Sequence, residues 1–197
     1  MKSLLVALFL SVVLLGTAGA RLGETKKECE KRYGSWKPKD EESLFSDPEK
    51  YYGYVVDKSF NGLDVALIFR KTDDICVWVT YIKNYKSPDD IEFTPEMVED
   101  LLKRNYPDPQ DLFVMTNSEG IIEGRPTGKK WMARWANQRN NDTALANCGQ
   151  ELEGEYIFAL TCMSENYGKE MLDWVKNKDE ILKQREREKT KKALQGL

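Results

Sequence analysis

Carboxylates, lysines, tyrosines and cysteines are the reactive side chains of this 197-residue sequence, which contains no histidine. Without histidine there can be no Ser-His-Asp triad, no Cys-His pair and no HExxH zinc site. Carboxylates cluster at Asp73-Asp74, at Asp89-Asp90, and at Glu151, Glu153 and Glu155. A glycosidase needs two carboxyl groups in a pocket, one of them with a raised pKa, whereas these clusters lie in hydrophilic, turn-like stretches typical of solvated surface. We therefore predict no catalytic residue, no metal site and no cofactor.

The first twenty residues have the features of a secretory signal peptide. Lys2 gives a positive start, residues 4–15 are apolar except for Ser11, and Ala18-Gly19-Ala20 matches an A-x-A cleavage site. The apolar stretch is shorter than the roughly 20 residues that span a membrane, and no later stretch is apolar enough. We expect cleavage after Ala20 and export to the periplasm or the exterior, with no transmembrane segment. The net charge of −3 argues against a nucleic-acid partner.

The four cysteines of the sequence are Cys29, Cys76, Cys148 and Cys162. An even number of cysteines in an exported chain favours two disulfides. Cys29 is expected on the inner face of a helix that covers the strand of Cys76, which predicts a Cys29–Cys76 bridge and leaves Cys148–Cys162 by elimination. In a simple hairpin, however, Cys162 lies several residues away from Cys148, too far for the Cα separation of about 5.5 Å that a disulfide needs. The second pair therefore needs a different strand pairing, or these two cysteines are free.

Aromatic side chains cluster on two of the predicted strands. Tyr52 and Tyr54 fall near the start of the first strand, and Trp131 and Trp135 share one face of a later strand. Tyrosine and tryptophan dominate the energetics of protein interfaces, although on strands they also form core and cross-strand pairs. We predict Tyr52, Tyr54, Trp131 and Trp135 as a candidate binding surface, with positions in the core as the alternative.

Helices and strands alternate along the rest of the chain. A capping box at Thr25–Glu28 predicts a short helix ending at Gly34, and Thr94-Pro95-Glu96 predicts the start of a second helix. An Asn-Gly turn joins the first two strands, and the third strand is apolar on both faces, which predicts a central position in the sheet. The predicted strands are 51–57, 63–70, 75–83, 112–115, 131–135, 143–146 and 156–162. A last helix begins near Asn166 and is almost entirely charged beyond Leu182.

This order predicts an α+β fold, an antiparallel β-sheet with short helices packed on it and a long charged C-terminal helix. We expect a signal peptide at 1–20, an α+β domain at 21–168 whose two helix-plus-strands halves could be a degenerate repeat, and the charged helix or tail at 169–197. The tail is rich in lysine and arginine. It is either a solvated helix or a docking arm for an acidic partner or an anionic surface.

The opening of the mature chain resembles a family of small exported bacterial proteins of unknown function. The resemblance rests on Leu22-Gly23-Glu24-Thr25, Cys29 and Arg32-Tyr33-Gly34, an LGET-xxx-C-xxRYG segment. The Asn-Gly hairpin, a strand with Cys76 and Tyr81, the Trp131 strand and a charged helix ending Leu194-Gln195-Gly196-Leu197 are also similar. More distantly, a capped helix followed by a strand meander is similar to outer-membrane-assembly lipoprotein domains and to the β-lactamase-inhibitor-like fold. That similarity implies a binding or assembly module.

The residues and the resemblance together favour a non-catalytic protein that binds a protein or envelope partner, for example in envelope assembly. The alternative is a carboxylate-dependent hydrolase that acts on an envelope glycan. A deep pocket with two carboxyl groups about 5–9 Å apart would favour the hydrolase. A sheet face lined by exposed aromatic side chains would favour binding.

Overall fold

The computed structural model describes residues 22–34, 37–38, 46–60, 62–106, 108 and 110–195. The predicted signal peptide, Asn61 of the predicted turn and the last two residues lie outside them. The strands are β1 (Lys37–Pro38), β2 (Tyr51–Phe60), β3 (Leu63–Arg70), β4 (Cys76–Tyr85), β5 (Phe113–Glu119), β6 (Ile121–Ile122), β7 (Arg125–Pro126), β8 (Trp131–Asn137), β9 (Thr143–Leu152) and β10 (Glu155–Met163). The helices are α2 (Lys26–Tyr33), α3 (Pro95–Asn105) and α4 (Glu165–Gln195), with a short 3-10 turn at Pro88–Asp90.

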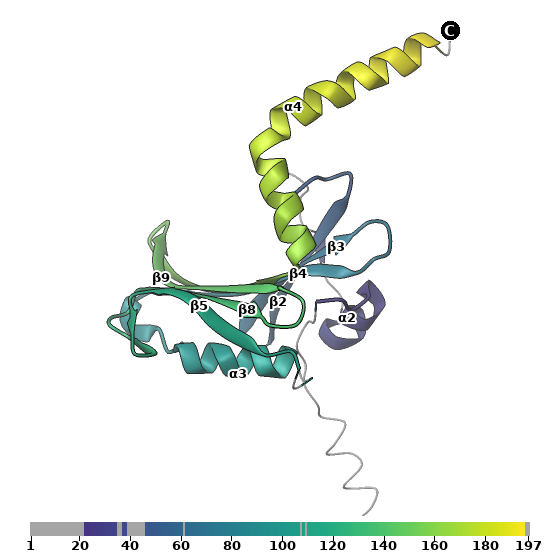
Figure 1. Ribbon diagram of the computed structural model, residues 1–197. Coiled ribbons are helices and arrows are strands. Elements are labelled where there is room, and N and C mark those ends of the chain that lie inside the picture. Colours follow the sequence, from purple (N-terminus) through teal and green to yellow (C-terminus); the bar gives the residue numbers. More distant parts are fainter. Residues whose placement is uncertain are drawn as a thin grey trace, which may run out of the picture.

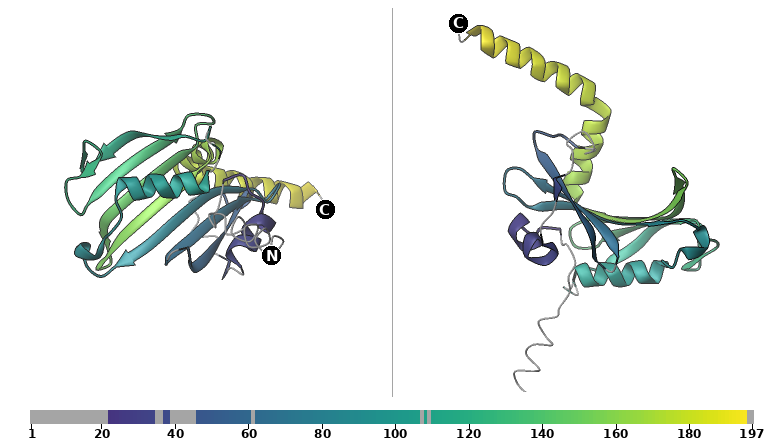
Figure 2. Two further views of the ribbon diagram at one scale, coloured as in Figure 1. Left: turned by 90° about the horizontal axis from the view of Figure 1, so that it is seen from below. Right: turned by 180° about the vertical axis from the view of Figure 1, so that it is seen from behind.

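Eight of the described strands form one antiparallel sheet in the order β1-β2-β3-β4-β10-β9-β8-β5, and β6 and β7 form a separate hairpin. The predicted α+β class is confirmed, as is the central position of β4, which pairs with β3 on one side and β10 on the other. The α2 and α3 helices lie on one face of this sheet, and α4 rises from the opposite face (Figures 1 and 2).

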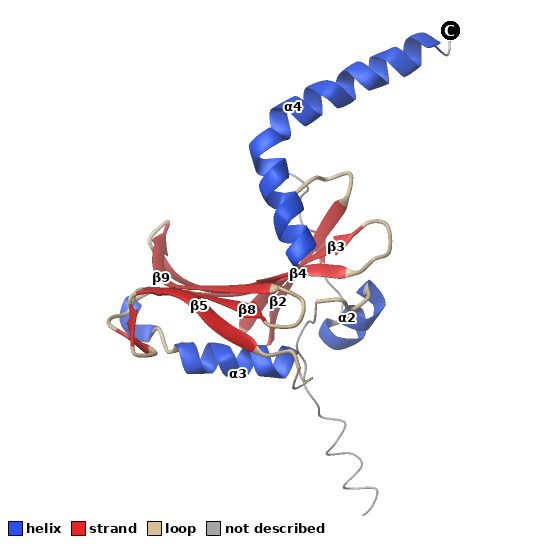
Figure 3. Ribbon diagram, in the orientation of Figure 1, coloured by secondary structure: helices blue, strands red, loops and turns tan. Residues whose placement is uncertain are grey.

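The main core lies between α3, α2 and one face of the sheet. Strand positions two residues apart share a face, so Val65, Leu67 and Phe69 of β3 point the same way and are buried. Val98, Leu101 and Leu102 form the inner stripe of α3 and are also buried. Figure 3 shows how α3 runs beneath the red sheet that it covers. Because burying a large apolar side chain contributes about 1.5–3 kcal/mol, this face holds most of the fold's stability.

The first two described helices begin where the sequence predicts. The Thr25 side chain accepts a hydrogen bond from the Glu28 backbone N–H, and Glu28 Oε2 accepts from the Thr25 backbone N–H at 2.8 Å, which completes the capping box. The Thr94 hydroxyl accepts a hydrogen bond from the Met97 N–H, and Pro95 occupies the first helical position, where no backbone donor is needed.

The expected pair of disulfides is wrong, because all four cysteines are buried free thiols, whereas the alternative that Cys148 and Cys162 are free is confirmed. Cys148 of β9 pairs with Phe158 of β10, whereas Cys162 pairs with Ala144. The two cysteines are thus four residues apart along the strands, or about 13 Å, which excludes a disulfide. Burial raises the pKa of Cys148 to about 11 and, despite a hydrogen bond to Tyr106, that of Cys162 to about 12.

The other two cysteines are neighbours but not bonded. The α2 helix covers β4 as expected, and burial, together with the adjacent Cys29 thiol, raises the pKa of Cys76. Each thiol also contacts an acceptor of its own: Cys76 Sγ lies 3.5 Å from the Trp78 carbonyl oxygen, and Cys29 Sγ lies 3.8 Å from Glu24 Oε2. The prediction of a Cys29–Cys76 bridge is therefore also wrong.

The long helix α4 packs on the second face of the sheet only through its first turns. Tyr167 and Trp174 are buried, and the Tyr167 ring meets that of Tyr51 edge-on with the centroids 5.0 Å apart. Further along, α4 bends and projects away from the body (Figure 1). Arg185 attaches this outer half to the segment before β2: its Nη1 and Nη2 donate to the two carboxylate oxygens of Asp47 at 2.9 and 2.5 Å.

We predict that Asp47→Asn destabilises the protein and makes its free energy of unfolding depend less on pH in the acid range. Burial alone would raise the pKa of Asp47, but hydrogen bonds from Arg185 and from the Glu49 backbone N–H outweigh it and hold that pKa below its usual value. A carboxyl group whose pKa is lower in the folded state stabilises the fold at pH values above its unfolded-state pKa. This stabilisation is lost as the pH falls through the folded-state pKa. We expect the variant to be about 1–3 kcal/mol less stable at pH 7, with a smaller loss below pH 4.

Urea denaturation at pH 7 and pH 3 measures this effect, and Asp73→Asn is the matched control. Asp73 pairs with Arg70 within one turn and at the surface, at 2.5 Å, so its removal should change stability little. Equal losses in the two variants would show that the Asp47–Arg185 contact does not hold α4.

Candidate functional site

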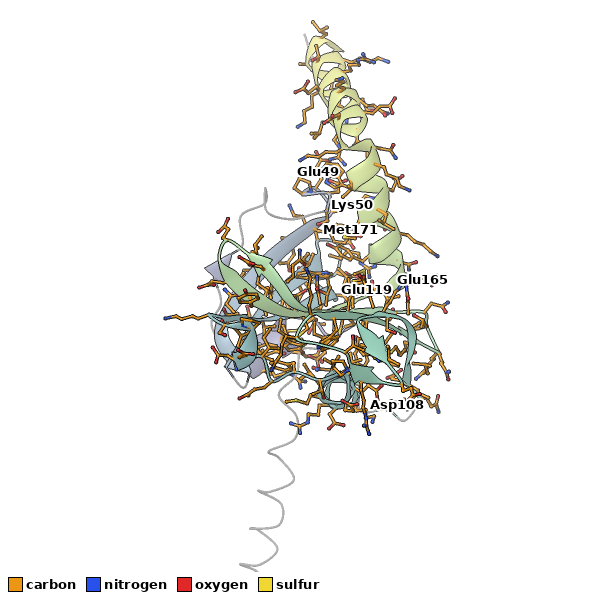
Figure 4. All side chains as sticks on the ribbon, turned by 90° about the vertical axis from the view of Figure 1, so that its left-hand side faces the viewer. Glu49, Lys50, Asp108, Glu119, Glu165 and Met171 are labelled. Atoms are coloured by element: carbon orange, nitrogen blue, oxygen red, sulfur yellow. The ribbon has the colours of Figure 1, made fainter. Side chains whose placement is uncertain are left out.

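A groove of about 810 Å³ lies between the second face of the sheet and the first turns of α4. Here α4 packs against Tyr51, Ile68 and Val77 of β2, β3 and β4, and no described helix lies over β5, β8 and β9 on this face (Figure 1). The floor of the groove comes from Met132 and Leu145, its wall from Met171 and Leu172, and Arg134 also belongs to the lining. Figure 4 labels Glu119 of β5 and Glu165 and Met171 of α4 near the point where α4 meets the sheet.

Methionine gives the groove its character. Met132, Met163 and Met171 all line it and are partly exposed, and each comes from a different element. Unbranched, polarisable methionine side chains adapt to the shape of a partner and recur in surfaces that bind varied ligands. Leu145 and Leu172 extend the apolar lining and remain 36% and 56% exposed. An apolar cleft of this size is the kind of surface that ligands occupy.

Charged groups lie at the edge of the apolar lining. Arg134 pairs with Asn117 of β5 and Leu145 of β9 in the sheet register. Among the described residues, no carboxylate forms an ion pair with its guanidinium group, which is thus available to an anionic group of a ligand. Across the groove, Lys169 donates to Glu165 at 2.7 Å, and this contact lowers the pKa of Glu165.

Buried Asp142 positions the wall of the groove. Its Oδ1 accepts a hydrogen bond from the Glu165 backbone N–H at 3.2 Å, and its Oδ2 accepts from Asn140 Nδ2 at 2.9 Å. Burial raises the pKa of Asp142 above the usual value, although both hydrogen bonds lower it. The carboxylate thus serves as an acceptor at the N-terminus of α4, where unpaired backbone donors need one.

The four aromatic residues of the predicted binding surface do not come together in the groove. Trp131 and Trp135 are 3% and 0% exposed and belong to the main core, so their assignment to a binding surface is corrected. Odd-numbered residues of β8 face α3, whereas the even-numbered Met132 and Arg134 face the groove. The sequence of residues 131–135 already indicated these two faces. Arginine is mostly exposed, so Arg134 marks the outer face of the strand and the two tryptophans lie on the other.

Tyr52 and Tyr54 lie on the α2 side of β2, away from the groove. Their hydroxyl groups are already occupied: Tyr52 donates to Asp74 Oδ1 at 2.5 Å, and Lys26 Nζ donates to the Tyr54 hydroxyl at 2.8 Å. The Tyr52 ring also stacks on Phe69, with the centroids 5.6 Å apart. These contacts connect α2 to the sheet, so the two tyrosines have a structural role here.

The carboxylate clusters seen in the sequence also lie outside the groove. Asp73 is paired with Arg70, and Glu151, Glu153 and Glu155 are exposed around the β9–β10 turn. The two carboxylates that do line the groove, Glu119 and Glu165, were not singled out by the sequence analysis. A general acid needs a raised pKa, and that of Glu165 is lowered.

Searches for related proteins give no further assignment: no protein-family model, characterised protein or solved structure matches this chain. Within the described part of the chain, no group of three or more Cys, Asp or Glu side chains is placed to hold a metal ion. None of the described helices is both long enough and apolar enough to cross a bilayer.

Proposed function

We propose that this chain is a non-catalytic binding module and that the groove beside α4 is its ligand site. The observation that carries the proposal is the groove itself, about 810 Å³ with three methionines in its lining and Arg134 at its edge. The ligand would place an apolar segment on Met132, Met163 and Met171 and an anionic group against the Arg134 guanidinium. Such a site supplies binding and orientation, with the apolar lining and the Arg134 guanidinium as its main contacts.

The cellular setting of the proposal comes from the sequence. The predicted signal peptide at 1–20 would deliver the protein to the periplasm or the exterior. The resemblance to exported bacterial proteins, and to small assembly domains, supports an envelope-assembly role with a protein partner. A carboxylate-dependent hydrolase acting on an envelope glycan is the competing function, and it would have to use Glu119 and Glu165.

The proposal predicts that Leu145→Asp weakens the binding of an apolar probe. With 1-anilinonaphthalene-8-sulfonate, whose rings suit the apolar lining and whose sulfonate suits Arg134, we expect at least about tenfold weaker binding. A new charge on the floor of the groove would have to be desolvated by the probe. Fluorescence titration of the folded protein measures this.

Leu152→Asp provides the matched control, because Leu152 is on the same strand, is 56% exposed and lies outside the groove. Equal probe binding by the two variants would contradict the proposed site. Release of sugar fragments from purified peptidoglycan by the wild-type protein, lost in Glu119→Gln, would establish the competing hydrolase instead.

A further inference from the structure

An apolar stripe continues from the groove along α4. Leu172 lines the groove, and Val175 and Leu182 follow at i+3 and i+10, which places the three on one face of a helix with 3.6 residues per turn. Val175 is 58% and Leu182 39% exposed. Apolar side chains at this spacing on a surface helix normally face a core, yet here they face solvent.

Lysines lie on both sides of this stripe. Lys176 and Lys183, two turns apart, lie on one side, while Lys178 and Lys189, three turns apart, lie on the other. All four are exposed, and within the described residues none forms an ion pair with a carboxylate. Asp179 and Glu186 lie within the stripe itself, at i+7 and i+14 from Leu172, and the four lysines beside them leave this face with a net positive charge. The surface around the stripe is therefore basic.

The helix that carries these residues has a fixed position. Its first turns are buried through Tyr167 and Trp174, and its outer half is attached through Arg185 to Asp47, with Glu49 3.2 Å from Arg185 Nε. The Arg185 guanidinium also lies 5.6 Å from the Trp174 ring centroid. The stripe and its lysines are thus held in one geometry relative to the groove, which lowers the entropic cost of binding.

We propose, building on the proposed function, that the ligand is a protein segment in which apolar residues are followed by a run of Asp and Glu. The apolar part lies in the groove, and the acidic part runs along the α4 stripe between the two rows of lysines. Charge complementarity selects an acidic segment over a basic one. The recessed groove suits a narrow chain and not the flat surface of a bilayer, which favours a protein segment over an anionic membrane.

Two synthetic peptides test this proposal with the full mature chain. Both carry a fluorescein label and the same alternating leucine and valine segment, followed in one by six glutamates and in the other by six lysines. We expect the acidic peptide to bind at least about tenfold more tightly by fluorescence anisotropy. We also expect its affinity to fall as salt is raised, because exposed charges are screened.

The double variant Lys176→Glu/Lys183→Glu should weaken binding of the acidic peptide about tenfold while leaving binding of the anilinonaphthalene probe unchanged. Lys27→Glu/Lys31→Glu on α2 makes the same change in net charge on another exposed helix. It should bind the acidic peptide like the wild type. Equal loss in both double variants would show that net charge alone matters and would overturn the proposal.

The remaining outcomes separate this inference from the function on which it rests. If both peptides bind equally well and Leu145→Asp abolishes both, the groove is the site but the preference for an acidic segment is wrong. If Leu145→Asp affects neither peptide nor the probe, the proposed function itself fails. Binding to vesicles with about 30% phosphatidylglycerol, without binding of the acidic peptide, would identify a lipid surface as the partner and overturn the inference.

Discussion

Trp135→Ala is expected to destabilise the protein by about 3–5 kcal/mol, the range for removing a large aromatic side chain from a core. Trp135 is fully buried on the α3 face of β8, in the same core as Leu102 and Leu160. The substitution would leave a large cavity that α3 and the sheet cannot both move to fill, because each is held by its own contacts. Urea denaturation followed by far-ultraviolet circular dichroism measures the change.

Met132→Ala is the matched variant, on the same strand but on the groove face. Met132 is only partly buried, so we expect a loss of about 1 kcal/mol together with weaker binding of the anilinonaphthalene probe. The two variants thereby distinguish the faces of β8. A Trp135→Ala protein that kept wild-type stability and lost only ligand binding would restore tryptophan to the binding surface and contradict the assignment of these two faces.

Gly149→Ala should destabilise the protein by about 3 kcal/mol or more, an unusual cost for a single methyl group. Gly149 is the extra residue of a β-bulge, since Cys148 pairs with Phe158 and Gln150 with Ile157. Its φ of +74° is unfavourable for any residue with a side chain. A Cβ atom there would also lie 2.2 Å from the Lys129 carbonyl oxygen, so the backbone before β8 would have to move.

Gly154→Ala separates the cost of the positive φ from the cost of the close contact with the Lys129 backbone. Gly154 has a φ of +82°, but a Cβ atom added there would meet nothing within 4 Å beyond its own chain neighbours. We therefore expect only the conformational cost of about 1–2 kcal/mol. Thermal and urea unfolding of the two variants give the difference directly. Equal losses would mean that the close approach of the Lys129 backbone does not matter for stability.

The secondary structure could be predicted from the sequence because its signals are local. The Thr25–Glu28 capping box and the Thr94-Pro95 start of α3 each act within a few residues. The strands extend a few residues further than predicted, as β9 does to Leu152, because pairing partners stabilise ends that have no signal of their own.

The cysteines and the groove could not be predicted because they depend on contacts between distant residues. The even cysteine count favoured two disulfides, although the hairpin argument already left Cys148 and Cys162 open as free cysteines. The register between β9 and β10, with its bulge at Gly149, and the absence of a Cys29–Cys76 bond appear only in the folded structure. The direction in which α4 leaves the sheet depends on Arg185 meeting Asp47, 138 residues earlier in the chain. Trp131 and Trp135 could be placed together on one face of a strand, but whether that face is covered depends on α3, which comes from a different part of the chain.

The α4 helix has 31 residues and, at 1.5 Å per residue, a contour of about 45 Å. One end of it forms the wall of the groove and the other end reaches solvent, and the Arg185–Asp47 contact lies between them. The groove wall and the solvent-exposed end therefore belong to one secondary-structure element, so a ligand in the groove and a partner at residues 186–195 would both contact α4.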